Sequence, residues 1–81
     1  MTLDDIREEA DAAERRYGPF ASTHEGYGVL AEEQMELLTA IRSNDLAAIR
    51  AEAVQCAAVA LRLAQACDDA GSAFILRSGV R

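Results

Sequence analysis

The sequence predicts an all-α domain of three main helices and a short C-terminal tail, which oligomerises into four-helix-bundle units. Three observations predict this fold: apolar residues recur every three to four positions, helix-breaking residues separate these runs, and 17 of the 81 residues are Ala, the strongest helix former. Small apolar side chains bury little area, so we expect a chain of this length to need further copies of itself to complete a core.

The first helix is expected within residues 1–18. Thr2 is a candidate N-cap, and Asp4 and Asp5 lie in the first turn, where the helix dipole favours negative charge. Gly18 and Pro19 follow the last apolar position and should end the helix. This pattern predicts one amphipathic helix of about four turns.

The second helix is expected within residues 22–43. Ser22 and Glu25 have the spacing of a capping box, with Ser22 as the N-cap. Gly26 and Gly28 weaken the first turns by about 1 kcal/mol each relative to Ala. Close approach of a neighbouring backbone or of a ligand would explain such a cost.

The third helix is expected within residues 45–70, after the capping sequence Ser43-Asn44-Asp45, with Gly71 as its end. Residues 72–81 then form a tail, which we expect to dock through its apolar residues 74–76. The apolar stripe of the third helix comprises Leu46, Ile49, Ala53, Cys56, Ala57, Ala60, Leu63, Ala64 and Cys67.

Composition excludes several classes of protein. The formal charge of −6 and the pI near 4.6 argue against binding to a nucleic acid polymer, which needs a basic surface. The first ten residues do not resemble a signal peptide, and the longest apolar run is too short to span a bilayer. We therefore expect no membrane partner and a cytoplasmic location, in a bacterium or in a phage-infected host. The two cysteines lack the spacing of a zinc site.

Acidic residues form the pattern with the clearest chemical meaning. Glu32, Glu33 and Glu36 lie on adjacent positions of one helical surface, and Glu52 follows on the next helix. If these helices pack antiparallel, Glu36 and Glu52 can face each other. Carboxylate pairs on facing helices suit Mg²⁺ or Mn²⁺ rather than Zn²⁺. The alternative is a solvated acidic helix face without a ligand.

The order of these elements resembles the MazG-like, all-α nucleoside triphosphate pyrophosphohydrolases. Their signature is EExxE on one helix and ExxD on the next, which residues 32–36 match in full and residues 52–55 match except at the last position. The stretch 17–27 is similar to small MazG-like proteins of bacteriophages. The resemblance covers roughly residues 15–67 of the chain.

This resemblance implies cleavage of a nucleoside triphosphate into a monophosphate and pyrophosphate, in a dimer or tetramer of the chain. It implies that Glu33, Glu36 and Glu52 are Mg²⁺ ligands and that Glu32 activates water. Gln55 stands where the family has an Asp ligand, and an amide offers one neutral oxygen instead of a carboxylate. A nucleotide-binding protein that sequesters its ligand without turnover is therefore an alternative, and a ligand-free helical interaction module is another.

Four further side chains are candidates for contact with the nucleotide. His24 and Tyr27 lie near the start of the second helix, and Gln55 and Arg62 lie on the third. Arginine is suited to phosphate oxygens, and the helical angle places Arg62 near Gln55. The other arginines considered for this role are Arg15, Arg16 and Arg50.

Overall fold

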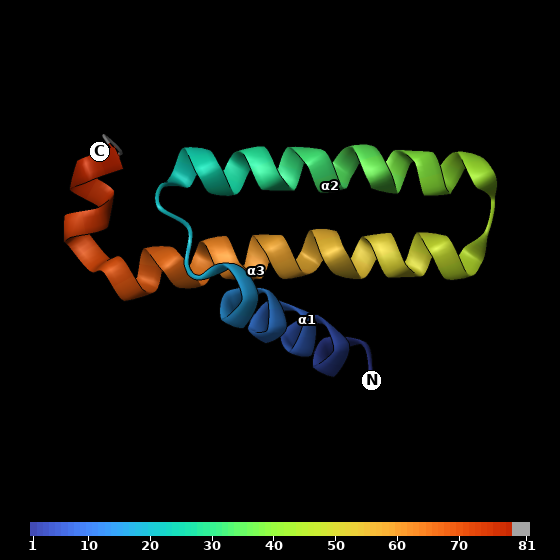
Figure 1. Ribbon diagram of the computed structural model, residues 1–81, viewed down its shortest axis with the longest axis horizontal. Coiled ribbons are helices and arrows are strands. Elements are labelled where there is room, and N and C mark those ends of the chain that lie inside the picture. Colours follow the sequence, from blue (N-terminus) through green and yellow to red (C-terminus); the bar gives the residue numbers. More distant parts are fainter. Residues whose placement is uncertain (79–81) are drawn as a thin grey trace.

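The computed structural model describes the backbone of residues 1–78 and the side chains of residues 1–69. The described backbone forms three helices, α1 (Thr2–Tyr17), α2 (Thr23–Ser43) and α3 (Leu46–Ser78), and no strand. The all-α prediction is therefore confirmed. Helices α2 and α3 run antiparallel, side by side, whereas α1 crosses α3 obliquely (Figure 1). Both α1 and α2 pack against α3, which makes α3 the central helix.

The C-terminal end of α1 lies where the sequence predicts it, but the N-terminal end does not. Gly18 has φ of 77°, a left-handed conformation that favours glycine, and its N–H donates to the Glu14 carbonyl at 2.9 Å. The prediction that Thr2 is the N-cap was wrong. Thr2 already lies inside the helix, and the Met1 carbonyl accepts the Asp5 N–H at 3.0 Å, which makes Met1 the N-cap.

Side-chain caps fix the beginnings of α2 and α3. Ser22 Oγ accepts the backbone N–H of Glu25 at 3.1 Å, as the capping box predicts. The Glu25 carboxylate accepts the N–H of Ala21 instead of that of Ser22. Asp45 Oδ1 accepts the backbone N–H groups of Ala47 and Ala48, at 3.0 and 3.3 Å. These bonds hold the α2–α3 turn tight, so that the two helices return alongside each other.

The expected end of the third helix at Gly71 was wrong, because α3 continues to Ser78. A single glycine costs a helix only about 1 kcal/mol, and no proline follows it to remove a hydrogen bond. Figure 1 shows α3 changing direction toward its C-terminal end. The expected docking of residues 74–76 lies outside the described side chains.

The core of the described residues consists of small side chains. The buried apolar residues are Ala10, Ala40, Val54, Ala58 and Val59. The expected stripe on the third helix was wrong in part, since Leu46, Ala53, Ala60 and Ala64 are exposed. The periodicity of apolar residues predicts one buried face of α3. In the structure α1 and α2 cover two parts of its circumference, with Val54, Ala58 and Val59 buried there, and part of the predicted stripe faces solvent.

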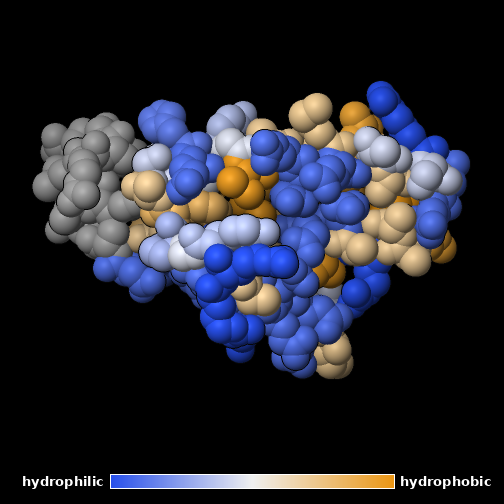
Figure 2. Space-filling view, in the orientation of Figure 1, coloured by the Kyte–Doolittle hydropathy of each residue, from blue (hydrophilic) through white to orange (hydrophobic). Residues whose placement is uncertain are grey.

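Apolar side chains are also exposed along the outer surface of α2 and at its turn into α3. Tyr27 is 66% exposed, and Leu38, Ile41 and Leu46 are exposed as well. Figure 2 shows apolar residues among hydrophilic ones at the end of the molecule where α2 turns into α3. None of the helices in the described part combines the length and the apolar character that crossing a bilayer requires.

Replacing Gly26 and Gly28 of α2 with alanine, one at a time, should change the free energy of unfolding in opposite directions. A Cβ at Gly26 would lie 2.7 Å from Leu63 Cδ1 and 3.1 Å from Phe20 Cδ2, whereas a Cβ at Gly28 would meet no atom within 4 Å. We expect Gly26→Ala to destabilise the protein by about 1–2 kcal/mol through overpacking. We expect Gly28→Ala to stabilise it by up to about 1 kcal/mol through helix propensity.

Thermal and urea unfolding of the two variants would test this comparison. The two substitutions are chemically identical and two residues apart, so each serves as the control of the other. Equal effects of both would contradict a close approach of α2 to α3 at Gly26.

Candidate functional site

Three carboxylates from α2 and α3 converge at the α2–α3 interface. Glu33 and Glu36 lie one turn apart on α2, and Glu52 lies opposite them on α3. One oxygen of each of the three side chains lies within 4.8 Å of those of the other two. The antiparallel hairpin thus brings together the three residues that the sequence predicts as metal ligands.

Two of these carboxylates carry an oxygen that is buried without a partner. Glu33 Oε1 and Glu52 Oε1 are both inaccessible to solvent, and neither accepts a hydrogen bond from the described residues. Burial raises the pKa of Glu33, and the negative charges of the neighbouring carboxylates raise it further. A cation at this position would remove the repulsion and satisfy the buried oxygens.

The Cys56 thiol lies near the same carboxylates. Burial raises its pKa, and the negative charges of Glu33 and of the other two cluster residues add to the effect. The thiol is therefore kept protonated at neutral pH, which suits a half-buried apolar side chain rather than a nucleophile.

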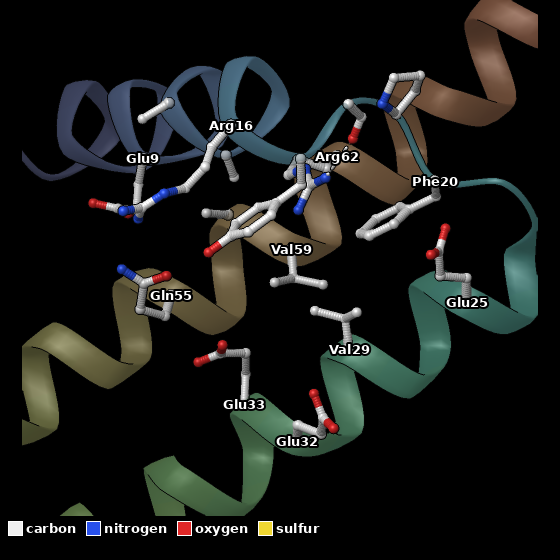
Figure 3. A pocket seen from close by; sticks show the side chains of 16 residues that line it. Glu9, Arg16, Phe20, Glu25, Val29, Glu32, Glu33, Gln55, Val59 and Arg62 are labelled. Atoms are coloured by element: carbon white, nitrogen blue, oxygen red, sulfur yellow. Dashed lines mark hydrogen bonds between the residues drawn. The ribbon is translucent and has the colours of Figure 1, made fainter.

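An open groove of about 570 Å³ adjoins the carboxylate cluster. Its floor is α3 and its walls are α1 and α2 (Figure 3). Glu32 and Glu33 line the α2 wall, so Glu33 belongs both to the cluster and to the groove. Gln55 lines the floor, three residues after the cluster residue Glu52 on α3. A ligand in this groove would therefore lie beside the three carboxylates.

Arg62 lines the groove at the end where α1 leads into α2, but its charge is already paired. It is 5% exposed, and its Nε donates to Glu14 Oε2 at 2.8 Å. Its Nη2 donates to the Gly18 carbonyl at 3.1 Å, and its guanidinium lies 4.2 Å from the centre of the Phe20 ring. These contacts make Arg62 a link between α3, the end of α1 and the connector.

Two of the predicted nucleotide contacts lie outside the groove in this chain. His24 and Tyr27 are exposed, and neither lines the groove. The groove side of α2 is formed by Glu25, Val29 and the acidic pair that follows. Tyr27 lies two positions from both Glu25 and Val29, which turns it about 200° around the helix from each of them. These two side chains therefore lie outside the groove of this chain, and their contact with a nucleotide stays a prediction.

The α1 wall of the groove is the part that the acidic motif does not predict. It consists of Glu9, Ala12, Ala13, Arg16 and Tyr17. Amphipathic spacing predicted the helix, but its crossing of α3 depends on tertiary packing. Only the consideration of Arg16 as a candidate phosphate ligand pointed to a contribution of the first helix to the site.

No protein-family model, curated protein or solved structure matches this chain. The MazG-like resemblance stays a prediction that rests on residues 17–27, 32–36 and 52–55.

Proposed function

We propose that this protein is a MazG-like nucleotide pyrophosphohydrolase that uses Mg²⁺, or Mn²⁺, held by Glu33, Glu36 and Glu52. The observation that carries the proposal is the convergence of these three carboxylates, with two buried oxygens that have no hydrogen-bond partner among the described residues. Buried carboxylate oxygens without a hydrogen-bond partner are uncommon in folded proteins, because burying an unpaired charge is costly. The groove beside the cluster gives a nucleotide a place to bind.

The donor set fits a hard divalent cation. All three groups are carboxylates, which Mg²⁺ and Mn²⁺ prefer, and the cluster contains neither histidine nor thiolate. A bound divalent cation neutralises phosphate charge and acidifies water. Because the pKa of Glu33 is raised, protons compete with a cation for this carboxylate up to a higher pH than at an ordinary glutamate.

In the proposed reaction, the oxygen of a water molecule forms a bond to the α phosphorus of the nucleotide. The bond between that phosphorus and the oxygen that bridges to the β phosphorus breaks, and its electron pair leaves with pyrophosphate. Glu32, exposed on the groove wall beside Glu33, accepts the proton of the water. The products are a nucleoside monophosphate and pyrophosphate.

One observation favours a second function, sequestration of a nucleotide or a nucleotide-derived signal without turnover. Gln55 lies on the groove floor where the MazG-like motif has an aspartate. The amide can donate and accept hydrogen bonds to a ligand, but it adds no negative charge to the metal site. Binding would then be retained while water activation is weakened.

Pyrophosphate release with a panel of ribo- and deoxyribonucleoside triphosphates and Mg²⁺ or Mn²⁺ distinguishes the two functions. For an enzyme, we expect Glu36→Gln to lower turnover at least a hundredfold, because the site loses one of three anionic ligands. We expect Gln55→Asp to raise turnover by restoring a fourth carboxylate. For a sequestering protein, a nucleotide should raise the melting temperature without forming product.

A matched control is Glu8→Gln, which removes an exposed carboxylate of α1 outside the cluster and the groove. It should leave pyrophosphate release unchanged. If neither product nor ligand-dependent stabilisation appears with any metal and nucleotide, both functions are excluded and a helical interaction module remains.

We also propose that a second copy of the chain covers the exposed apolar face of α2. Tyr27, Leu38 and Ile41 are exposed there, and the core of the chain holds only small side chains. Pairing two α2–α3 hairpins would give a four-helix unit and bury these residues. Light scattering should then give a multiple of the 8.7 kDa chain mass, and a monomeric mass would contradict the proposal.

A further inference from the structure

The groove contains one arginine whose charge is not paired within the described residues. Four glutamates and two arginines line it: Glu9, Glu25, Glu32, Glu33, Arg16 and Arg62. The charge of Arg62 is neutralised by Glu14. The ion pairs of the described part of the chain join Arg50 to Asp5 and Arg62 to Glu14, and neither includes Arg16.

Arg16 lies on the α1 wall, opposite the α2 wall that carries Glu25, Glu32 and Glu33. Figure 3 shows Arg16 and Glu9 extending from α1 on one side of the groove, Glu32 and Glu33 on α2 on the other, and Gln55 between them on α3. The guanidinium lies 5.7 Å from the centre of the Tyr17 ring, which keeps the side chain near the wall without a hydrogen-bond partner there. Its donors are therefore available to a ligand in the groove.

We propose that Arg16 binds the β- and γ-phosphates of the nucleotide, on the side of the groove opposite the carboxylate cluster. This inference rests on the proposed nucleotide function and names a substrate-binding residue that the MazG-like motif does not include. A nucleoside triphosphate keeps a net negative charge even when one divalent cation neutralises two of its charges. The α2 wall carries Glu25, Glu32 and Glu33, and Glu9 adds a further negative charge on α1. These carboxylates would repel an anionic ligand, so its binding requires a cation in the groove, which Arg16 supplies.

The chemistry of the guanidinium fits this role. Its planar set of donors forms paired, charge-assisted hydrogen bonds to phosphate oxygens. During cleavage, negative charge develops on the oxygen that leaves with pyrophosphate, and a cation bound to that group stabilises it. Arg16 thus selects ligands that carry a phosphate chain over nucleoside monophosphates.

Arg15 provides a matched comparison. It is the neighbouring residue, equally charged and also exposed, but it is turned about 100° around α1 and does not line the groove. Both substitutions to Ala change the net charge by one unit at adjacent positions. A difference between them therefore reports the position of the guanidinium rather than the total charge.

Calorimetric titration with the α,β-methylene analogues of ATP, GTP, CTP and UTP, in Mg²⁺, would test the inference. We expect Arg16→Ala to raise the Kd of the tightest analogue about tenfold or more, because a charge-assisted hydrogen bond is lost. The Kd of the matching monophosphate, and that of Mn²⁺ alone measured by electron paramagnetic resonance, should change less than twofold. Arg15→Ala should leave all three values within twofold, and Arg16→Lys should recover part of the analogue affinity.

Two outcomes would overturn the inference while leaving the proposed function intact. One is an equal loss of analogue affinity in Arg15→Ala and Arg16→Ala, which would indicate a general charge effect. The other is an equal loss of triphosphate-analogue and monophosphate affinity in Arg16→Ala, which would indicate a structural role. If the unsubstituted protein binds none of the analogues, the proposed function itself fails, and the inference fails with it.

Discussion

Replacing Glu33 with glutamine is expected to stabilise the metal-free protein at neutral pH and to abolish its stabilisation by Mg²⁺. Glu33 is the member of the cluster whose pKa is raised by burial and by the surrounding carboxylates. The neutral amide keeps the shape of the side chain and removes both the cost of burying a charge and the repulsion. We expect a gain of about 1 kcal/mol, which for a domain of this size raises the melting temperature by about 4–8 °C.

The pH dependence of the unsubstituted protein should have a defined sign. Between the ordinary Glu pKa of 4.5 and the raised value in the folded protein, the folded state binds more protons at Glu33 than the unfolded state. Stability contributed by Glu33 therefore falls as pH rises through this window. The lowered pKa of Asp5, caused by its hydrogen bond to Arg50, acts in the opposite sense and only below its ordinary value of 3.8.

Thermal unfolding from pH 4.5 to pH 8, with EDTA and with Mg²⁺, measures both effects. Glu33→Gln should flatten the pH dependence in EDTA and remove the difference between the two solutions. Glu32→Gln, at the next position but outside the cluster, should keep most of the Mg²⁺ response. Destabilisation by Glu33→Gln in EDTA would mean that the carboxylate is satisfied without a metal, against the unpaired oxygen observed.

Local signals in the sequence predicted most of the secondary structure. Ser22, Asp45 and Gly18 occupy their expected capping positions because short-range hydrogen bonds decide them. The capping and helix-ending signals failed at Thr2 and Gly71, where the free-energy difference between the alternative helix ends is small. Thr2 lies inside α1 because a helix can begin at any available carbonyl, and Gly71 does not end α3 because its cost is about 1 kcal/mol.

The carboxylate cluster could be predicted because it depends on two simple distances. Glu33 and Glu36 are one turn apart, and a tight turn brings Glu52 opposite them. The groove could not be predicted, because its second wall comes from the oblique crossing of α1 over α3. The same crossing changed the role of Arg62. Helical angles placed it on the same face of the helix as Gln55, and both line the groove, but they could not show that Glu14 would pair with it.

Arg62→Met is expected to have the largest effect on stability among the substitutions considered, with a loss of about 2 kcal/mol. Methionine retains the packing of the aliphatic stem but loses the hydrogen bonds to Glu14 and Gly18 and the contact with the Phe20 ring. Removing one partner of a fully buried ion pair costs about 3–5 kcal/mol. The Glu14 side chain is 37% exposed and can be hydrated again, which places the expected loss below that range.

Besides lowering the stability of the whole protein, Arg62→Met should loosen the attachment of α1 in particular. Arg62 links the C-terminal end of α1 to α3, whereas the N-terminal part of α1 is held by the exposed Arg50–Asp5 pair, which contributes little because solvent screens the two charges. Amide hydrogen exchange in Arg62→Met should accelerate in α1 more than in α2. Arg50→Met, the matched control, should change exchange and melting temperature only slightly.

Because α1 carries Arg16, loosening it should also remove one wall of the groove. In Arg62→Met we therefore expect a weaker affinity for the α,β-methylene nucleotide analogues and an unchanged affinity for Mn²⁺, since Glu33, Glu36 and Glu52 all lie on α2 and α3. A variant that keeps the full analogue affinity while α1 exchanges rapidly would show that α1 is not part of the binding site. An unchanged melting temperature would show that the guanidinium contacts contribute little to the attachment of α1.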